Sequence, residues 1–353
     1  MDDLTSRLHV LRGREVPLGG PRGMTVMRTL PHRDCSLVGP WCFVDQFGPD
    51  DVFATGGMQV ARHPHTGLAT VSWLFEGAIT HRDSIGSHVL VTPGAVDVMT
   101  AGRGITHSEF TTNDTTTLHG VQLWFAQPDA QRFGDPAFAL ASTERIEADA
   151  FALRAGFGEH SVTGPGDQVV TARGDLQMGV PLDFLEITLD SDIEVTAHLD
   201  AGHEYAVVVD RGPVTVGAGE RPVVEADGYD LVLVPERSES VRLTAGEAGA
   251  RVLLIGGEPL GEDIVMWWNF VGRSHEEIAE FRARYQQEMG FEGADGEALD
   301  PDSDAARPAT EGDLLFGTFP PNTPRPLPAP RLPGGRLRSR GRRPQERREG
   351  RGT

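Results

Sequence analysis

Residues 63–77 read HPHTGLATVSWLFEG and decide which fold the sequence predicts. Within them Thr70–Phe75 is a short apolar run that ends at a Glu-Gly turn. Comparable runs, bounded by Gly, Pro and Asp, recur roughly every 8–12 residues from Met24 to about Gln127, which is typical of an antiparallel sandwich or barrel. The pattern predicts an all-β fold and disfavours a parallel α/β fold.

A second β-rich run follows from Val180 to Gly257 and repeats the order of the first. The strand and acidic-Gly turn of Val71–Gly77 have a counterpart in Val207–Gly212, which indicates an internal duplication. A chain of 353 residues is long enough for two such domains. We therefore expect a first β domain at 1–135, a linker and edge strand at 136–179, a second β domain with a closing helix at 180–290, and a Pro/Arg-rich tail at 291–353.

One helix is expected, at Ser274–Gln287, and we expect it to pack on the second domain. Ser274 and Glu277 form a capping-box pattern, and Ile278, Phe281 and Tyr285 lie at helical spacing on one face. The tail beyond about residue 300 is rich in Pro and Arg, a composition that buries too little apolar surface to offset chain entropy. We expect it to be disordered.

Charge and cysteine content limit the class of protein. The net charge is −20, but residues 331–353 carry nine Arg against two Glu, so residues 1–330 are near −27. Such an acidic body repels nucleic acid and anionic membrane. Only two cysteines, Cys35 and Cys42, are present, and no apolar run approaches the roughly 20 residues of a membrane span. We expect a soluble, cytoplasmic protein whose folded part binds no nucleic acid directly.

Four residues form a candidate metal site. His63 and His65 are two apart, so in a strand they leave the same face, and His107 and Glu109 repeat this spacing 42 residues after His65. Three imidazoles and one carboxylate suit Fe(II), Mn, Ni, Cu or Zn better than Ca or Mg, which prefer all-oxygen ligands. The sequence predicts one metal ion in the first domain and singles out no catalytic residue beyond these four.

Of the other histidines, His81, His88 and His119 in the first domain are expected to have structural roles. The alternative is that they orient the metal ligands or the substrate. In the second domain His198 and His203 are five residues apart, which is not a same-face spacing in a strand, and no later His-x-Glu pair follows them. We therefore expect the second domain to hold no metal, and both cysteines to be structural.

Three segments of the first domain together resemble the signature of the pirin family of cupin proteins: residues 63–77, Pro93-Gly94, and residues 99–109, which read MTAGRGITHSE. Residues 257–260 and the helix after them resemble the pirin C-terminal domain, so the resemblance covers roughly residues 5–290. It implies two tandem cupin barrels, with a non-haem iron held in the first by His63, His65, His107 and Glu109.

The resemblance also implies two functions. Some pirins are quercetin 2,3-dioxygenases, which would make the partners of this chain a small aromatic substrate, such as a flavonol or another enediol, and O₂. Another pirin is a redox-sensitive transcriptional co-regulator, which would make this chain a metal-dependent module that binds a protein partner. A third reading, a cupin isomerase that uses Zn or Mn, is open on the ligand set alone.

Many pirins carry Glu where this chain has Ala69. That Glu does not correspond to the carboxylate assigned here as a ligand, so we expect metal binding to survive. We expect any hydrogen bond or proton transfer from that Glu to be missing.

Overall fold

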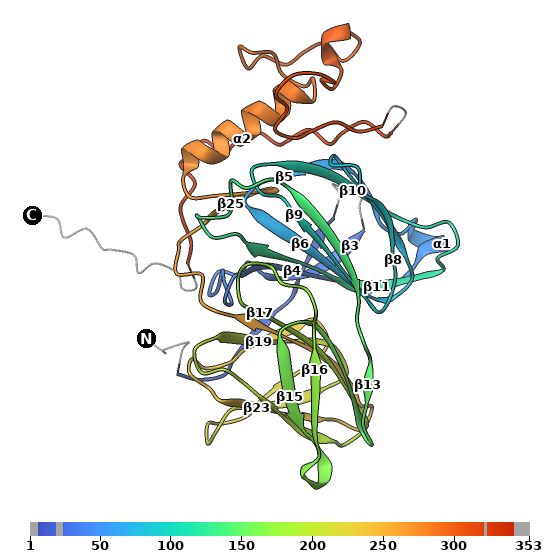
Figure 1. Ribbon diagram of the computed structural model, residues 1–353, viewed down its shortest axis with the longest axis vertical. Coiled ribbons are helices and arrows are strands. Elements are labelled where there is room, and N and C mark those ends of the chain that lie inside the picture. Colours follow the sequence, from blue (N-terminus) through green and yellow to red (C-terminus); the bar gives the residue numbers. More distant parts are fainter. Residues whose placement is uncertain (1–5, 19–23, 321–322, 342–353) are drawn as a thin grey trace, which may run out of the picture.

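The computed structural model describes residues 6–18, 24–320 and 323–341, which form two β-barrels, one above the other in Figure 1. The first barrel consists of a seven-stranded sheet, β12-β9-β6-β11-β4-β3-β2, and a four-stranded sheet, β5-β10-β7-β8. Its elements are β2 (Arg14–Pro17), β3 (Thr25–Leu30), β4 (Trp41–Asp51), α1 (Val52–Thr55), β5 (Gln59–His65), β6 (Leu68–Glu76), β7 (Ile79–Asp83), β8 (His88–Val91), β9 (Ala95–Thr100), β10 (Ile105–Thr111), β11 (Thr117–Ala126) and β12 (Ala137–Ser142).

The second barrel repeats this plan, with a seven-stranded sheet, β1-β22-β19-β24-β17-β14-β13, and a six-stranded sheet, β16-β15-β18-β23-β20-β21. Its strands are β1 (His9–Arg12), β13 (Ile146–Glu147), β14 (Phe151–Phe157), β15 (Glu159–Thr163), β16 (Val169–Arg173), β17 (Leu182–Leu189), β18 (Glu194–His198), β19 (Glu204–Arg211), β20 (Val214–Gly217), β21 (Val224–Ala226), β22 (Asp230–Leu233), β23 (Ser240–Ala245) and β24 (Ala250–Gly257), with a short 3₁₀ turn at Pro165–Asp167. The prediction of an all-β protein with two tandem cupin barrels is confirmed.

The structure departs from the expected domain division at two places. Strand β1 lies near the start of the chain but pairs with β22 of the second barrel, so residues 1–135 do not form one domain. The segment 136–179, expected to be a linker and an edge strand, contains strands of both barrels: β12 pairs with β9 at the edge of the first barrel's sheet, and β14 pairs with β17. Pairing partners far away in the sequence leave no local signal, which is why the sequence pattern missed them.

The two seven-stranded sheets pack face to face and share one apolar core. Trp41 of the first barrel lies among aromatic rings of both barrels, with its ring centroid 6.2 Å from that of Phe184. Its indole N–H donates to the carbonyl of Gly256 at 2.7 Å, and the indole of Trp73 donates to Glu186 at the same distance. Buried Trp side chains usually find such partners, and here both partners lie in the other barrel. The shared core fixes the barrels against each other.

Helix α2 (His275–Glu288) begins where the sequence predicted, with the Ser274 hydroxyl accepting from the Glu277 N–H at 3.1 Å. It packs beside the first barrel and not on the second as expected (Figure 1). The apolar face of α2 covers the hairpin of β25 (Val265–Trp267) and β26 (Phe270–Gly272), and Phe270 forms a bridge to Thr66 next to β5. An apolar stripe predicts that one face of a helix is buried but not which element buries it.

Among the described residues, no helix is both long and apolar enough to cross a bilayer.

The expected disorder beyond about residue 300 is wrong for the described part of the tail. Phe316 is fully buried against α2, and its N–H donates to Glu288 at 2.9 Å. Ala329 is also buried there, and a short 3₁₀ turn spans Asp304–Ala306. A few apolar residues and hydrogen bonds to the body are enough to order a chain that proline already keeps extended. Residues 342–353 lie outside the described residues.

Candidate metal centre

Strands β5 and β10 carry the four predicted ligands and pair with each other antiparallel. In their register His63 lies opposite His107, and His65 lies opposite Ile105. All three imidazoles are buried on one side of the pair. The register shifts between His107 and Glu109, which marks a β-bulge. Bulges re-aim side chains, and this one determines where the Glu109 carboxylate lies.

The outer face of the same strands shows the expected alternation. Arg62, next to His63, donates from Nε to the Thr106 hydroxyl at 2.9 Å. Thr106 in turn donates to the Phe316 carbonyl at 2.9 Å. Arg62 and Thr106, each one residue before a candidate ligand, therefore point outward, under the C-terminal segment, and the inward positions are left to the histidines.

The three imidazoles converge on one point. Nε2 of His65 and Nε2 of His107 are 3.0 Å apart, and the ring centroids of His63 and His107 are 4.3 Å apart. Two nitrogens bound to one ion at about 2.1 Å and at a right angle would also be about 3.0 Å apart. Nδ1 of His63 lies 2.9 Å from the Ala61 carbonyl, so Nδ1 is the protonated nitrogen and Nε2 keeps its lone pair. The arrangement fits a shared divalent ion.

Glu109 shares a second group of converging ligand atoms with His107. Each of two overlapping groups has ligand atoms within 4.8 Å of one another: His63, His65 and His107, and His81, His107 and Glu109. The Ser72 hydroxyl is 3.2 Å from Glu109 Oε1 and 3.1 Å from the Gln122 amide oxygen. With one proton, it can donate to only one of them at a time.

His81, expected to be structural, is the neighbour that sequence analysis underestimated. Its Nδ1 lies 3.5 Å from Nδ1 of His107, and its Nε2 lies 3.4 Å from Asp83. Burial alone would lower the pKa of His81, but the bond to Asp83 and the charges of Asp97 and Glu109 raise it. Asp97 is fully buried without a hydrogen bond to either oxygen, and burial raises its pKa to about 7. The alternation of His81 and Asp83 on β7 was the only available signal.

His119 and His88, which were also expected to be structural, lie away from the site. His119 Nε2 is 2.7 Å from Asp210 of the second barrel and helps to join the barrels. His88 is exposed on β8. Both cysteines are buried, and burial raises the pKa of Cys42 to about 12, which keeps its thiol protonated.

Burial keeps the three ligand imidazoles neutral. It lowers the pKa of His63 to about 4 and holds the pKa values of His65 and His107 well below their usual range. Neutral imidazoles offer lone pairs without first releasing protons, as metal binding requires. Burial also raises the pKa of Glu109, against the opposing effects of His81 and Ser72. A divalent ion would offset the cost of burying this carboxylate as an anion.

The His63 shift predicts how the metal-free protein responds to pH. The unfolded chain binds a proton at His63 near pH 6.5, whereas the folded chain resists it until about pH 4. Stability from this group is therefore complete above pH 6.5 and falls by about 3 kcal/mol on acidification to pH 4. The pKa of Asp97 is shifted upward, so the pH dependence of wild-type stability alone does not isolate the effect of His63. We therefore compare the unfolding free energies of wild type and His63→Gln, measured by urea denaturation, and expect their difference to change by about 3 kcal/mol in favour of the variant between pH 6.5 and pH 4. Equal pH dependence of the two unfolding free energies would contradict this.

A cavity of about 680 Å³ opens onto the four candidate ligands. Aromatic and other apolar side chains dominate its walls, and Phe43 and Trp124 stack with ring centroids 3.9 Å apart. Its lining residues are Pro17, Leu18, Arg28, Pro31, Phe43, Val60, His63, His65, His107, Glu109, Gln122, Trp124, Met266, Trp268, Asn269, Leu327, Pro328 and Pro330. An apolar cleft with a few convergent polar groups is the usual form of a small-molecule site.

Ala69 does not face this cavity. It is fully buried in the core between the barrels, with Val71 and Trp73 on the same face of β6. Thr70 and Ser72 occupy the opposite face, and Ser72 is the residue that reaches Glu109. Position 69 therefore lies outside the immediate surroundings of the four candidate ligands.

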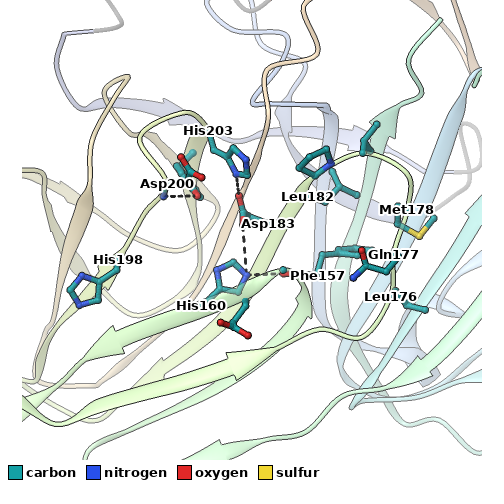
Figure 2. Close-up of a pocket in the computed structure, with 15 residues that line it drawn as sticks. Phe157, His160, Leu176, Gln177, Met178, Leu182, Asp183, His198, Asp200 and His203 are labelled. Carbon is teal, nitrogen blue, oxygen red and sulfur yellow. Dashed lines mark hydrogen bonds and ion pairs between the residues drawn. The ribbon is translucent and has the colours of Figure 1, made fainter. Parts of the chain in front are cut away.

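The second barrel has its own cavity, of about 300 Å³, at its mouth (Figure 2). His203 Nδ1 lies 2.6 Å from Asp183, and His160 Nε2 lies 2.7 Å from the Phe157 carbonyl. His198 stands apart from them and is 2.8 Å from Thr163 (Figure 2). Their five-residue spacing predicted that His198 and His203 would not share a face, and their rings indeed do not converge. His203 binds Asp183 instead, and His198 binds Thr163. The barrel interior behind them, at the place where the first barrel has its candidate ligands, is filled by apolar side chains: Val195, Ala197, Val241 and Leu243.

Comparisons with known proteins agree with this architecture. The family model described as Pirin matches residues 23–125, and the model described as Pirin C-terminal cupin domain matches residues 184–291. A protein of Pseudomonas aeruginosa, provisionally named as a quercetin 2,3-dioxygenase, is 34% identical over 79% of this chain and 84% of its own length. A pirin-like protein of Caulobacter vibrioides is 35% identical over 74% of this chain and 88% of its own. A crystal structure titled quercetin 2,3-dioxygenase, from Acinetobacter baumannii, is 29% identical, covers 94% of this chain and 98% of its own, and superposes with a TM-score of 0.76. The chain belongs to the pirin family.

Proposed function

We propose that the first barrel holds one metal ion, expected to be Fe(II), through His63, His65, His107 and Glu109. We propose further that the protein is an oxygenase of the quercetin 2,3-dioxygenase type that acts on a flavonol or another aromatic enediol. The observation that carries both proposals is an aromatic-walled cavity that ends at three neutral imidazoles and a buried carboxylate. The names of the Pseudomonas and Acinetobacter relatives support the choice of reaction.

The donor set supports the choice of metal class. Three neutral nitrogens and one carboxylate suit Fe(II), Mn, Ni, Cu and Zn, whereas Ca and Mg prefer oxygen ligands. When bound, iron would supply Lewis acidity and one-electron chemistry at the end of the cavity. Ser72 would orient Glu109 through its hydroxyl, 3.2 Å away. Such hydrogen bonds to ligands commonly tune a metal site.

The walls supply binding and exclusion of water. Phe43 is stacked between Trp124 and the guanidinium of Arg28, which lies 4.3 Å over its ring, and Trp124 meets the His65 ring edge-on with centroids 5.0 Å apart. A planar aromatic substrate can pack against these ordered side chains, because edge-to-face contacts and apolar burial both favour it. Its oxygens would then face the imidazoles at the end of the cavity. Exclusion of water strengthens every electrostatic interaction there.

Oxygen uptake tests the reaction. We expect protein loaded with Fe(II) under anaerobic conditions to consume O₂ when quercetin is added, and metal-free protein to consume none. His65→Gln should abolish uptake, because it removes one of two nitrogens only 3.0 Å apart. His88→Ala, an exposed histidine on β8, is the matched control and should retain full activity. No uptake with quercetin or a series of catechols, from protein shown to hold iron, would remove the oxygenase proposal and leave the metal site standing.

A further inference from the structure

The Pro-rich segment 323–332, which reads TPRPLPAPRL and which we call the strap, forms one wall of the cavity at the candidate metal site. Leu327, Pro328 and Pro330 of this strap line the cavity together with residues of the first barrel and of the β25–β26 hairpin. The sequence offered no role for the segment and predicted disorder. Its position beside the candidate metal ligands gives it one.

The strap is held by its backbone. Proline has no N–H, so between residues 326 and 330 only Leu327 and Ala329 can donate from the main chain. Both do, Leu327 to the Arg62 carbonyl and Ala329 to the Gln286 side chain, each at 2.8 Å. The Leu327 carbonyl accepts from the Tyr285 hydroxyl at 2.7 Å. Because prolines already restrict the segment to an extended form, ordering it costs little conformational entropy.

These bonds connect the strap to the strand that carries two candidate ligands. Arg62 precedes His63, and β5 is an edge strand of its sheet, so its outer side has no strand partner. The bond from Leu327 to Arg62 covers that edge next to the metal site. On its other side the strap is fastened to α2, where Arg282 donates to the Pro330 carbonyl at 2.6 Å. The strap therefore bridges the helix and the ligand-bearing strand.

We propose that the strap is the specificity wall of the cavity, which admits flat aromatic chelators and disfavours those with bulky substituents. Other walls of the cavity are fixed in sheets: Phe43 and Trp124 lie on β4 and β11, which pair along most of their length. In the described part of the chain the strap pairs with no strand, so its side chains, and not a sheet, set the width of the cavity on its side. The proposal rests on the proposed metal site, but it does not require the oxygenase reaction.

Binding of catechols to Fe(III)-loaded, full-length protein tests the proposal. Catecholates bound to Fe(III) absorb visible light, so titrations give the affinities of catechol and of 4-tert-butylcatechol. Leu327→Ala shortens the side chain in the wall and should raise the affinity for the bulky probe relative to catechol by about tenfold, the scale of discrimination by a few methyl groups in an apolar pocket. Leu332→Ala changes the same residue type in the strap but outside the cavity lining and should leave the ratio unchanged.

A second variant, Tyr285→Phe, tests the same proposal in case Leu327→Ala does not fold. Tyr285→Phe keeps the buried ring but removes the hydroxyl that holds the Leu327 carbonyl, and it should change the ratio in the same direction as Leu327→Ala. An unchanged ratio in both variants, with the absorption band present, would overturn the proposal while the metal site stands. Absence of the band in the wild-type protein would overturn the metal site and this proposal with it. A changed ratio without O₂ uptake on quercetin would support the strap and count only against the proposed reaction.

Discussion

His107→Ala is expected to weaken metal binding more than any other single substitution. His107 belongs to both groups of converging ligand atoms, and its Nε2 lies 3.0 Å from that of His65. Even substitutions that only disturb the support of a ligand commonly lower affinity by about 10–100-fold. We therefore expect loss of this ligand to lower affinity more than about a hundredfold, as measured by competition with a chelator of known affinity.

The metal affinities of two further variants show whether the effect is specific to His107. His88→Ala removes an exposed imidazole and should leave affinity unchanged. His81→Ala removes the neighbour of His107 without removing a proposed ligand, and it should weaken binding by about tenfold. If His81→Ala abolished binding as completely as His107→Ala, His81 would be a ligand and the proposed quartet would be wrong.

Trp41→Ala is expected to cause the largest loss of stability. Trp41 is fully buried between the barrels and contacts Phe125, Phe157 and Phe184. Its removal leaves a cavity and the Gly256 carbonyl without its donor. Large-to-Ala substitutions of this kind cost about 3–5 kcal/mol, which urea denaturation of the metal-free protein would measure.

The matched comparison is another aromatic residue. Phe53 is 81% exposed on α1, and Phe53→Ala should change the unfolding free energy by less than about 0.5 kcal/mol. A cost below about 1 kcal/mol for Trp41→Ala would mean that the cavity refills or that the barrels contribute little to each other's stability.

The convergence of the three histidines was predictable because its signal is local. A spacing of two places side chains on one face of a strand, and the structure brings His63, His65 and His107 together on that basis. The position of Glu109 depends on a bulge that no spacing reveals. The environment of His81 and Asp97 depends on three strands that meet only in the folded sheets. Composition also misled, because the Pro-rich tail reads as disordered although Leu327 and Ala329 donate to the body and the Leu327 and Pro330 carbonyls accept from it.

The position of the metal tests the central claim most directly. Crystals of protein loaded with Fe(II) under anaerobic conditions, measured at the iron absorption edge, would give an anomalous difference map. We expect one peak in the map, bounded by His63, His65, His107 and Glu109. A peak among His81, His107 and Glu109 with His63 and His65 free of it, or no peak in the first barrel, would mean that these four residues do not hold the ion.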